Sequence, residues 1–389
     1  MLDPAQYRRE ESRAKAQLPN WRLAQRHGAT LFQRVGFPVR VDCLDELGML
    51  LDTMQEGRFE AIQQELGGLA EAEQELLVQA LAEVVRFQLA HFGSRAPVLP
   101  LDTVTAMLAA YRKMQALSSG FGRVLEVGPG CGYLGLFLAR HAELERYAAV
   151  EATESFYLLQ HHLLAHLFGA GFREELAAQG QSAHFGAEFE AAAAALPIMS
   201  ALPAACATHH PWWRLGDLAR TESPAAGGKG FDLIVCNAAM LEFEAPALRD
   251  YLDLFNRVLA PGGLVFAQCF GFETPERDRN YLLAALREAR LAPVFMAWGG
   301  HPKGRGFWEQ RSPAGCPAFV PGADDRRFTT AQGVFVAEGH PLWEAASRPE
   351  NYCIHTMSDF APLAHFFARP QGARVLSAEE LARKVADAL

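Results

Sequence analysis

Four glycines and one acidic residue lie in one short stretch of the chain, residues 123–136, which reads RVLEVGPGCGYLGL. An apolar run gives way there to a glycine-rich turn and then to a helical pattern. Glycines let a ligand approach the backbone closely, and the amide groups at the start of a helix attract polar or anionic groups. The stretch therefore predicts a binding site for a nucleotide-type ligand.

The glycine spacing is compatible with more than one kind of turn. Gly130, Gly132 and Gly135 satisfy the G-x-G-x-x-G pattern of dinucleotide sites, and Glu151 ends the next apolar run, where such sites place an acidic residue. A turn that only packs a strand tightly against a helix would also need glycines. The spacing alone leaves these readings open.

Two kinds of elements must position this turn. Residues 43–117 place apolar side chains at steps of three and four between charged faces, which predicts helices, the last of them over residues 101–117. Short apolar runs then alternate with helical segments. These runs are RVLEVG, RYAAVE, WWRLGD, FDLIVCN, GGLVFAQCF, PVFMAWG and GVFVAEG. The alternation predicts an α/β fold with a mostly parallel sheet covered by helices on both faces.

The same pattern divides the chain into three parts. We expect a helical N-terminal region that covers the substrate side, a ligand-binding α/β domain interrupted by two insertions, and a C-terminal extension that ends in an amphipathic helix. The expected boundaries are 1–117, 118–345 with insertions at about 170–211 and 303–330, and 346–389.

Composition excludes several classes of protein. The chain of 389 residues has a formal net charge of -9, and its basic residues form no stripe, so we expect no nucleic-acid partner. Seven cysteines without a C-x-x-C pair indicate neither a disulfide framework nor a thiolate zinc site, which is typical of reduced cytoplasm. No apolar run reaches the roughly 18 residues of a membrane span, so we expect no membrane partner. The sequence leaves the oligomeric state open, a homodimer included.

The stretch VLEVGPGCG resembles the first motif of the class I S-adenosylmethionine-dependent methyltransferases. In that family the strand carries an acidic residue two positions before the first glycine, here Glu126. The turn then reads G-x-G-x-G, here Gly128, Gly130 and Gly132. Dinucleotide enzymes normally keep this strand apolar. The resemblance implies S-adenosyl-L-methionine as the cofactor and a Rossmann-like, doubly wound, seven-stranded sheet whose last strand is antiparallel.

Further motifs of the family follow in the same order. Glu151 stands where the family places the carboxylate that binds the ribose hydroxyls, and Asp217 in RLGDL where it often places an acid or amide facing the adenine amino group. FDLIVCN resembles the fourth-strand motif, whose last residue, Asn237, would also face the cofactor. RVLAPGGLVFAQ resembles the helix, turn and fifth strand that come next.

The resemblance implies methyl transfer to a hydroxyl or amine of a small molecule, as in the sugar O-methyltransferases. The fourth strand continues as CNAAMLEF and lacks the Asn-Pro-Pro-aromatic turn of enzymes that methylate DNA or glutamine. We expect no metal, because the chain lacks the carboxylate cluster that holds magnesium in catechol-type enzymes. Glu242 and His301 are the candidate catalytic residues, with Glu242 preferred, although a helix start and a strand end would explain them equally well.

Two other classes of function remain. An NAD(P)-dependent oxidoreductase would use the G-x-G-x-x-G spacing, and a non-catalytic binding protein would keep the methyltransferase fold without the reaction.

Several histidines attract attention. In HHPWW we expect Trp212 and Trp213 in the core, and His209 and His210 on the surface before the third strand. On the helix YLLQHHLLAHLF, His162 and His166 share one face, but a pair without a third ligand is a weak metal signal.

Overall fold

The computed structural model describes most of the chain. The described residues are 2–17, 38–55, 57–93, 95–118, 120–176, 206–237, 239–240, 243, 245–268, 275–297, 332–348 and 370–389.

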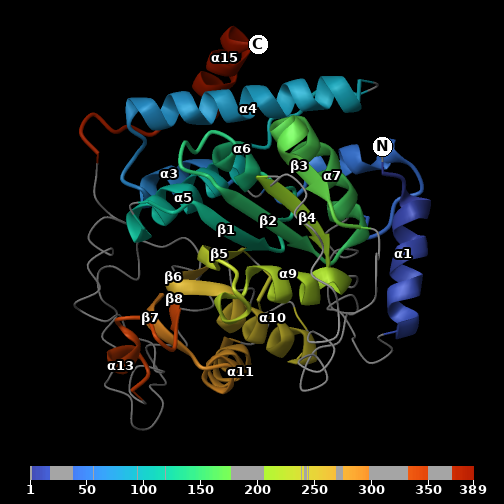
Figure 1. Ribbon diagram of the computed structural model, residues 1–389. Coiled ribbons are helices and arrows are strands. Elements are labelled where there is room, and N and C mark those ends of the chain that lie inside the picture. Colours follow the sequence, from blue (N-terminus) through green and yellow to red (C-terminus); the bar gives the residue numbers. More distant parts are fainter. Residues whose placement is uncertain are drawn as a thin grey trace.

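The centre of the molecule is one twisted sheet (Figure 1). Its described strands lie in the order β3-β4-β2-β1-β5-β6-β8-β7. Only β8 runs antiparallel to its neighbours, β6 and β7. The strands are β1 (Arg123–Val127), β2 (Arg146–Glu151), β3 (Phe172–Glu174), β4 (Ala207–Pro211), β5 (Phe231–Asn237), β6 (Leu259–Gln268), β7 (Leu291–Ala297) and β8 (Gln332–Ala337). Strands β2, β4 and β3 lie on one side of β1, and β5 and the later strands lie on its other side, so the direction in which strands are added changes at β1. This is the Rossmann-like doubly wound arrangement expected from the sequence, with one additional edge strand.

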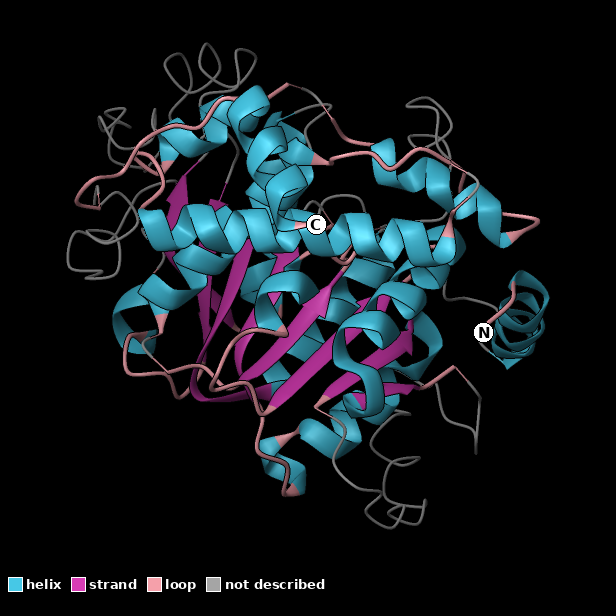
Figure 2. Cartoon of the chain, turned by 90° about the horizontal axis from the view of Figure 1, so that it is seen from above, coloured by secondary structure: helices cyan, strands magenta, loops and turns pink. Residues whose placement is uncertain are grey.

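Helices cover both faces of the sheet, as Figures 1 and 2 show. Helices α3, α4, α5, α6 and α7 belong to one hydrophobic cluster, and α9, α10 and α11 belong to the other. Strand residues alternate between the two clusters, as a sheet buried on both faces requires. The helices are α1 (Pro4–Gln17), α3 (Phe59–Glu65), α4 (Glu71–His91), α5 (Leu101–Leu117), α6 (Leu134–Leu138), α7 (Glu154–Phe168), α9 (Leu215–Glu222), α10 (Ala245–Val258), α11 (Pro275–Glu288), α13 (Trp343–Ala346) and α15 (Ala378–Ala388). Short 3₁₀ helices are η1 (Leu44–Asp52), η2 (Gly169–Gly171), η3 (Trp212–Arg214) and η4 (Pro224–Ala226).

The third expected strand was wrong. WWRLGD does not form a strand: residues 212–214 form η3 and residues 215–217 begin α9. The strand is β4, which lies just before them and has the sequence ATHHP. Every residue of β4 is buried, but its two histidines are polar, so a search for apolar runs does not find this strand. The short strand β3 lies beside it, within the segment that we expected to be an insertion.

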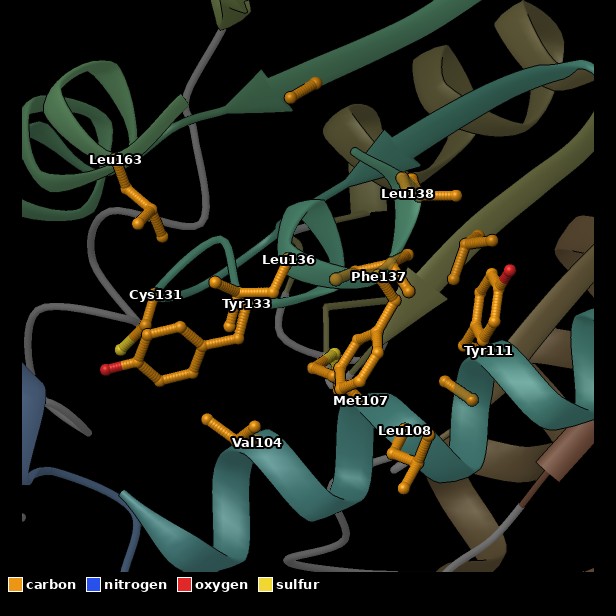
Figure 3. Close-up of a cluster of buried hydrophobic side chains, with 14 of the residues drawn as sticks. Val104, Met107, Leu108, Tyr111, Cys131, Tyr133, Leu136, Phe137, Leu138 and Leu163 are labelled. Carbon is orange, nitrogen blue, oxygen red and sulfur yellow. The ribbon is translucent and has the colours of Figure 1, made fainter. Parts of the chain in front are cut away.

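Helix α5 fixes the start of the sheet domain to the N-terminal helices. Figure 3 shows its apolar side chains facing those of α6, the helix that follows the glycine turn. The rings of Tyr111 and Phe137 stack with centroids 5.8 Å apart. Each fully buried side chain of this kind stabilises the fold by about 1.5–3 kcal/mol. This packing sets the position of α6 and therefore of the glycine turn.

The N-terminal region also contacts the edge of the sheet at which the parallel strands end. Asn237, the last residue of β5, donates from Nδ2 to the Met107 sulfur at 3.8 Å, and Cys131 Sγ contacts the Leu50 carbonyl oxygen at 3.5 Å. Gln332, which begins the antiparallel strand β8 at this edge, donates to Glu65 Oε1 at 3.1 Å. The carboxyl edge, where ligands of such sheets bind, is thus partly covered by α3, α5 and η1.

The C-terminal segment packs on the same helices. Leu69 and Arg374 form an antiparallel bridge, and Gln63 exchanges two hydrogen bonds with the backbone of Leu376. The Ser377 hydroxyl caps α15 by accepting from the Glu380 amide at 3.2 Å, as the capping-box spacing predicts.

We predict that replacing Lys113 by methionine destabilises the protein by about 3–5 kcal/mol, because its partner Glu65 would remain buried and charged. Both side chains of this ion pair are almost completely buried, with 2% and 3% exposed. Urea unfolding measures the effect. Lys229→Met is the control: Lys229 pairs with Glu145 in solvent, and its loss should cost less than about 1 kcal/mol. Equal costs for the two variants would contradict the prediction.

Candidate functional site

The glycine turn lies between β1 and α6, at the carboxyl edge of the sheet. Gly128, Gly130 and Gly132 have φ angles of +68°, +59° and +79°, a region that favours glycine. A Cβ on Gly128 would lie 2.7 Å from the Ala239 Cβ, so this glycine is needed for packing against the segment after β5. Among the described residues, a Cβ on Gly130 would meet nothing nearer than the Met54 methyl, at 4.0 Å. The backbone at Gly130 is therefore open to a ligand.

Glu126 lies in β1, two residues before the turn, and is completely buried. The Tyr147 hydroxyl donates to its Oε2 at 2.5 Å, whereas its Oε1 has no hydrogen-bond partner among the described residues. Burial raises the pKa of Glu126 to about 7, and the hydrogen bond from Tyr147 only partly offsets this effect. Glu126 thus offers an unused oxygen near the glycine turn.

Glu151 ends β2, the strand next to β1, and is held in place by three donors. Its Oε1 accepts from the amides of Ala152 and Thr153 at 2.7 and 2.8 Å, and its Oε2 accepts from Gln160 Nε2 at 2.8 Å. Burial raises the pKa of Glu151, against the effect of these hydrogen bonds. A carboxylate has about four acceptor positions, so Oε2 keeps one for a further donor such as a hydroxyl.

Gln160 of α7 joins the turn to this carboxylate, and sequence reasoning missed it. Its amide nitrogen donates to the Gly130 carbonyl at 2.6 Å as well as to Glu151. Its amide oxygen faces His209 Nε2 at 3.0 Å. The side chain is fully buried, so each of these bonds replaces one to water. The only sequence feature that could have indicated a role for Gln160 is that a polar residue lies within the apolar face of a helix.

The positions of the other predicted site residues do not test their proposed roles. Asp217 lies in the first turn of α9, where its carboxylate pairs with Arg214 and Arg220. Asn237 lies at the carboxyl edge, and its buried Oδ1 has no hydrogen-bond partner among the described residues. The contacts of both with a cofactor stay predictions. Glu242 and His301 lie outside the described residues.

The histidine expectations were partly wrong. Trp212 and Trp213 are buried, as expected, but His209 and His210 are buried too, because both lie within β4 rather than before a strand. His209 bonds Gln160, and His210 Nε2 bonds the Thr208 hydroxyl at 2.9 Å. Of the helical pair, His166 bonds Glu83 at 2.8 Å and His162 is buried.

Comparison with known proteins gives matches in structure alone. A scan against protein-family models finds no match, and a search of curated proteins finds none either. Within the described ranges, no helix combines the length and apolar character that crossing a membrane requires.

Several solved structures are similar to this chain. One is CalS10, an amino pentose methyltransferase from Micromonospora echinaspora, with 19% identity, a TM-score of 0.25, and coverage of 44% of this chain and 51% of that one. Another is the N-methyltransferase NodS from Bradyrhizobium japonicum, with 12% identity, a TM-score of 0.32, and coverage of 60% and 88%. A third is a TehB-like S-adenosylmethionine-dependent methyltransferase from Corynebacterium glutamicum, with 13% identity, a TM-score of 0.33, and coverage of 59% and 88%.

Each of these three structures is that of a methyltransferase. The chain spans about half the length of CalS10. At these scores the similarity adds no residue-level information. The fold assignment rests on the strand order and the site on the contacts above.

We predict that Glu126 makes stability depend on pH. A carboxyl whose pKa rises from 4.5 to about 7 on folding binds more protons in the folded state, so stability falls as pH rises through that window. The full effect is about 3 kcal/mol. Urea unfolding of ligand-free protein at pH 5 and pH 8 should show wild type losing up to this amount relative to Glu126→Gln. Parallel pH profiles for the two proteins would contradict the prediction.

Proposed function

We propose that this chain is an S-adenosylmethionine-dependent methyltransferase that methylates a hydroxyl or amine of a small molecule. The observation that supports it best is the open backbone at Gly130, flanked by carboxylates that each retain an acceptor position. A protein that used this turn only for packing would need glycine at 128 but not the open space at 130.

The residues present fit such a cofactor. Gly128, Gly130 and Gly132 would form the backbone surface against it, and Glu151 would accept from ribose hydroxyls through Oε2. The unused Oε1 of Glu126 and Oδ1 of Asn237 are further acceptors that an amino group could fill. Asp217 would accept a hydrogen bond from the adenine amino group, in exchange for its present ion pairs with Arg214 and Arg220. When bound, the cofactor supplies a methyl group on a positively charged sulfur.

The protein's own contribution is orientation. Aligning an acceptor with a reactive group can lower a barrier by about 7–11 kcal/mol. Helices α3 and α5 contact the carboxyl edge of the sheet. Glu65 of α3 bonds Gln332 at the start of β8, and Met107 of α5 contacts Asn237 at the end of β5. An edge that is partly covered by helices suits a small acceptor better than a nucleic acid, which also agrees with the net charge of -9. A sugar hydroxyl is the acceptor that we favour.

The first test is cofactor binding. Gly130→Val should abolish binding of S-adenosylmethionine and S-adenosylhomocysteine in calorimetry, because the side chain would fill the open space and strain a positive φ. Gly227→Val is the matched control: Gly227 also has a positive φ, of +88°, and open surroundings, but it lies in the loop after η4. Tight binding by Gly130→Val, or binding of NAD(P)H in place of S-adenosylmethionine by wild type, would overturn the proposal.

The second test concerns the proton of the acceptor. We propose that Glu242, or else His301, takes or orients it, since Glu242 closely follows Asn237 in the chain. Glu242→Gln should lower turnover by about 10²-fold while cofactor affinity stays near the wild-type value, measured with labelled cofactor and a metabolite pool. If Glu242→Gln and His301→Ala both turn over normally, orientation alone drives the reaction, and the acceptor is an amine or a thiol.

A further inference from the structure

Beside the glycine turn, three potential metal ligands come together from three elements. They are His161 of α7, Glu174 of β3 and His209 of β4, and one ligand atom of each lies within 4.8 Å of the others. Glu174 Oε2 is 2.6 Å from His161 Nδ1 and 3.2 Å from His209 Nδ1. Glu174 and His209 are also register partners in the sheet, so the backbone itself places them together.

Hydrogen-bond directions fix the orientation of His209. The amide nitrogen of Gln160 faces two acceptors, the Gly130 carbonyl and Glu151, and it uses both of its hydrogens there. The Gln160 oxygen must then face His209 Nε2, which can only donate to it. His209 therefore carries a proton on Nε2 and turns Nδ1 toward Glu174. A metal-ligating histidine has this arrangement, since its second nitrogen usually donates to a carbonyl or carboxylate.

Tyr157 orients the other side of the cluster. Its hydroxyl donates to Glu174 Oε1, which leaves Oε2 facing the two histidines. Its ring stacks on the His209 ring, with centroids 4.0 Å apart and planes 22° apart. Thus both the carboxylate and the deeper imidazole are held by neighbours before any ligand binds.

We propose that His161, Glu174 and His209 bind a divalent transition-metal ion, with zinc as the best fit. Two imidazoles and one carboxylate are a ligand set that zinc accepts, and they leave one position for solvent or another ligand. At metal–ligand distances of about 2.0–2.2 Å, ligand atoms in tetrahedral geometry lie about 3.3 Å apart. The Glu174–His209 pair, at 3.2 Å, is close to this spacing, and the Glu174–His161 pair, at 2.6 Å, would have to lengthen by less than about 1 Å.

The surroundings allow a metal ion to enter. Within the described residues, the side chains of His161 and Glu174 are 16% and 17% exposed, so solvent reaches two of the three ligands, whereas that of His209 is fully buried. The nearby cations Arg173 and Arg214 pair with Glu175 rather than with Glu174.

This proposal does not depend on the proposed function, and it differs from the sequence expectation of no metal. That expectation covered every metal, but it was argued from the lack of the carboxylate cluster that magnesium needs, whereas this set is mainly imidazole. The spacing of the ligands gave no signal, because they come from three elements separated in the chain.

The test is metal binding by the full, tag-free chain after chelator treatment and dialysis. Zinc titration by calorimetry, and cobalt titration by visible absorption, should each show one equivalent bound. His161→Gln and Glu174→Gln should weaken binding by about 100-fold or more, since each removes a ligand. His166→Gln is the control: it lies on the same helix, bonds Glu83 and should bind zinc like wild type.

Circular dichroism shows whether each variant is folded, and zinc should raise the melting temperature of wild type and His166→Gln but not of His161→Gln. Failure of folded wild type to bind one equivalent, or wild-type zinc affinity in both His161→Gln and Glu174→Gln, would overturn the proposal and leave the cluster as a hydrogen-bond network. Cofactor binding, measured separately, tests the proposed function and not this site.

Discussion

One buried amide, that of Gln160, joins the parts of the site that come from different elements. Its two N–H groups bind the carbonyl of Gly130 and the carboxylate of Glu151, and its oxygen accepts from His209. A buried polar group that loses its partners costs about 1–3 kcal/mol, so this side chain has one favourable orientation. Because α7 carries it, the packing of α7 on the sheet sets the relative positions of the glycine turn, the end of β2 and the middle of β4.

The second constraint is steric. The chain must turn sharply from β1 into α6, and it does so through glycines with positive φ, where a side chain would be strained. Gly128 also makes a close approach to Ala239, so the segment after β5 can lie against the turn. The same backbone conformation that allows this packing leaves the peptide at Gly130 uncovered. The fold and the candidate site thus share one cause.

Apolar patterning predicted the elements that are buried by apolar residues. The helix over 101–117 and the strand Phe231–Asn237 have the expected bounds, because each contains a strong period or a continuous apolar run. Strand β4 failed because His209 and His210 look like surface residues until their partners are known. Those partners, Gln160, Glu174 and Thr208, include residues from other elements, and only the three-dimensional fold brings them together. The Gly130 turn was predictable because all of its determinants are local.

Two carboxylates near the site, those of Glu126 and Glu174, differ in what surrounds them, and this difference separates their roles. Burial raises the pKa of both, but for Glu174 the contacts with His209 and His161 outweigh burial and lower the pKa. Glu126 has one donor, Tyr147, and its pKa rises to about 7. A positively charged ligand near Glu126 would favour the ionised form, because an opposite charge stabilises it. Glu126 is therefore suited to respond to a cationic ligand, whereas both oxygens of Glu174 already have partners, Tyr157 on one side and the two histidines on the other.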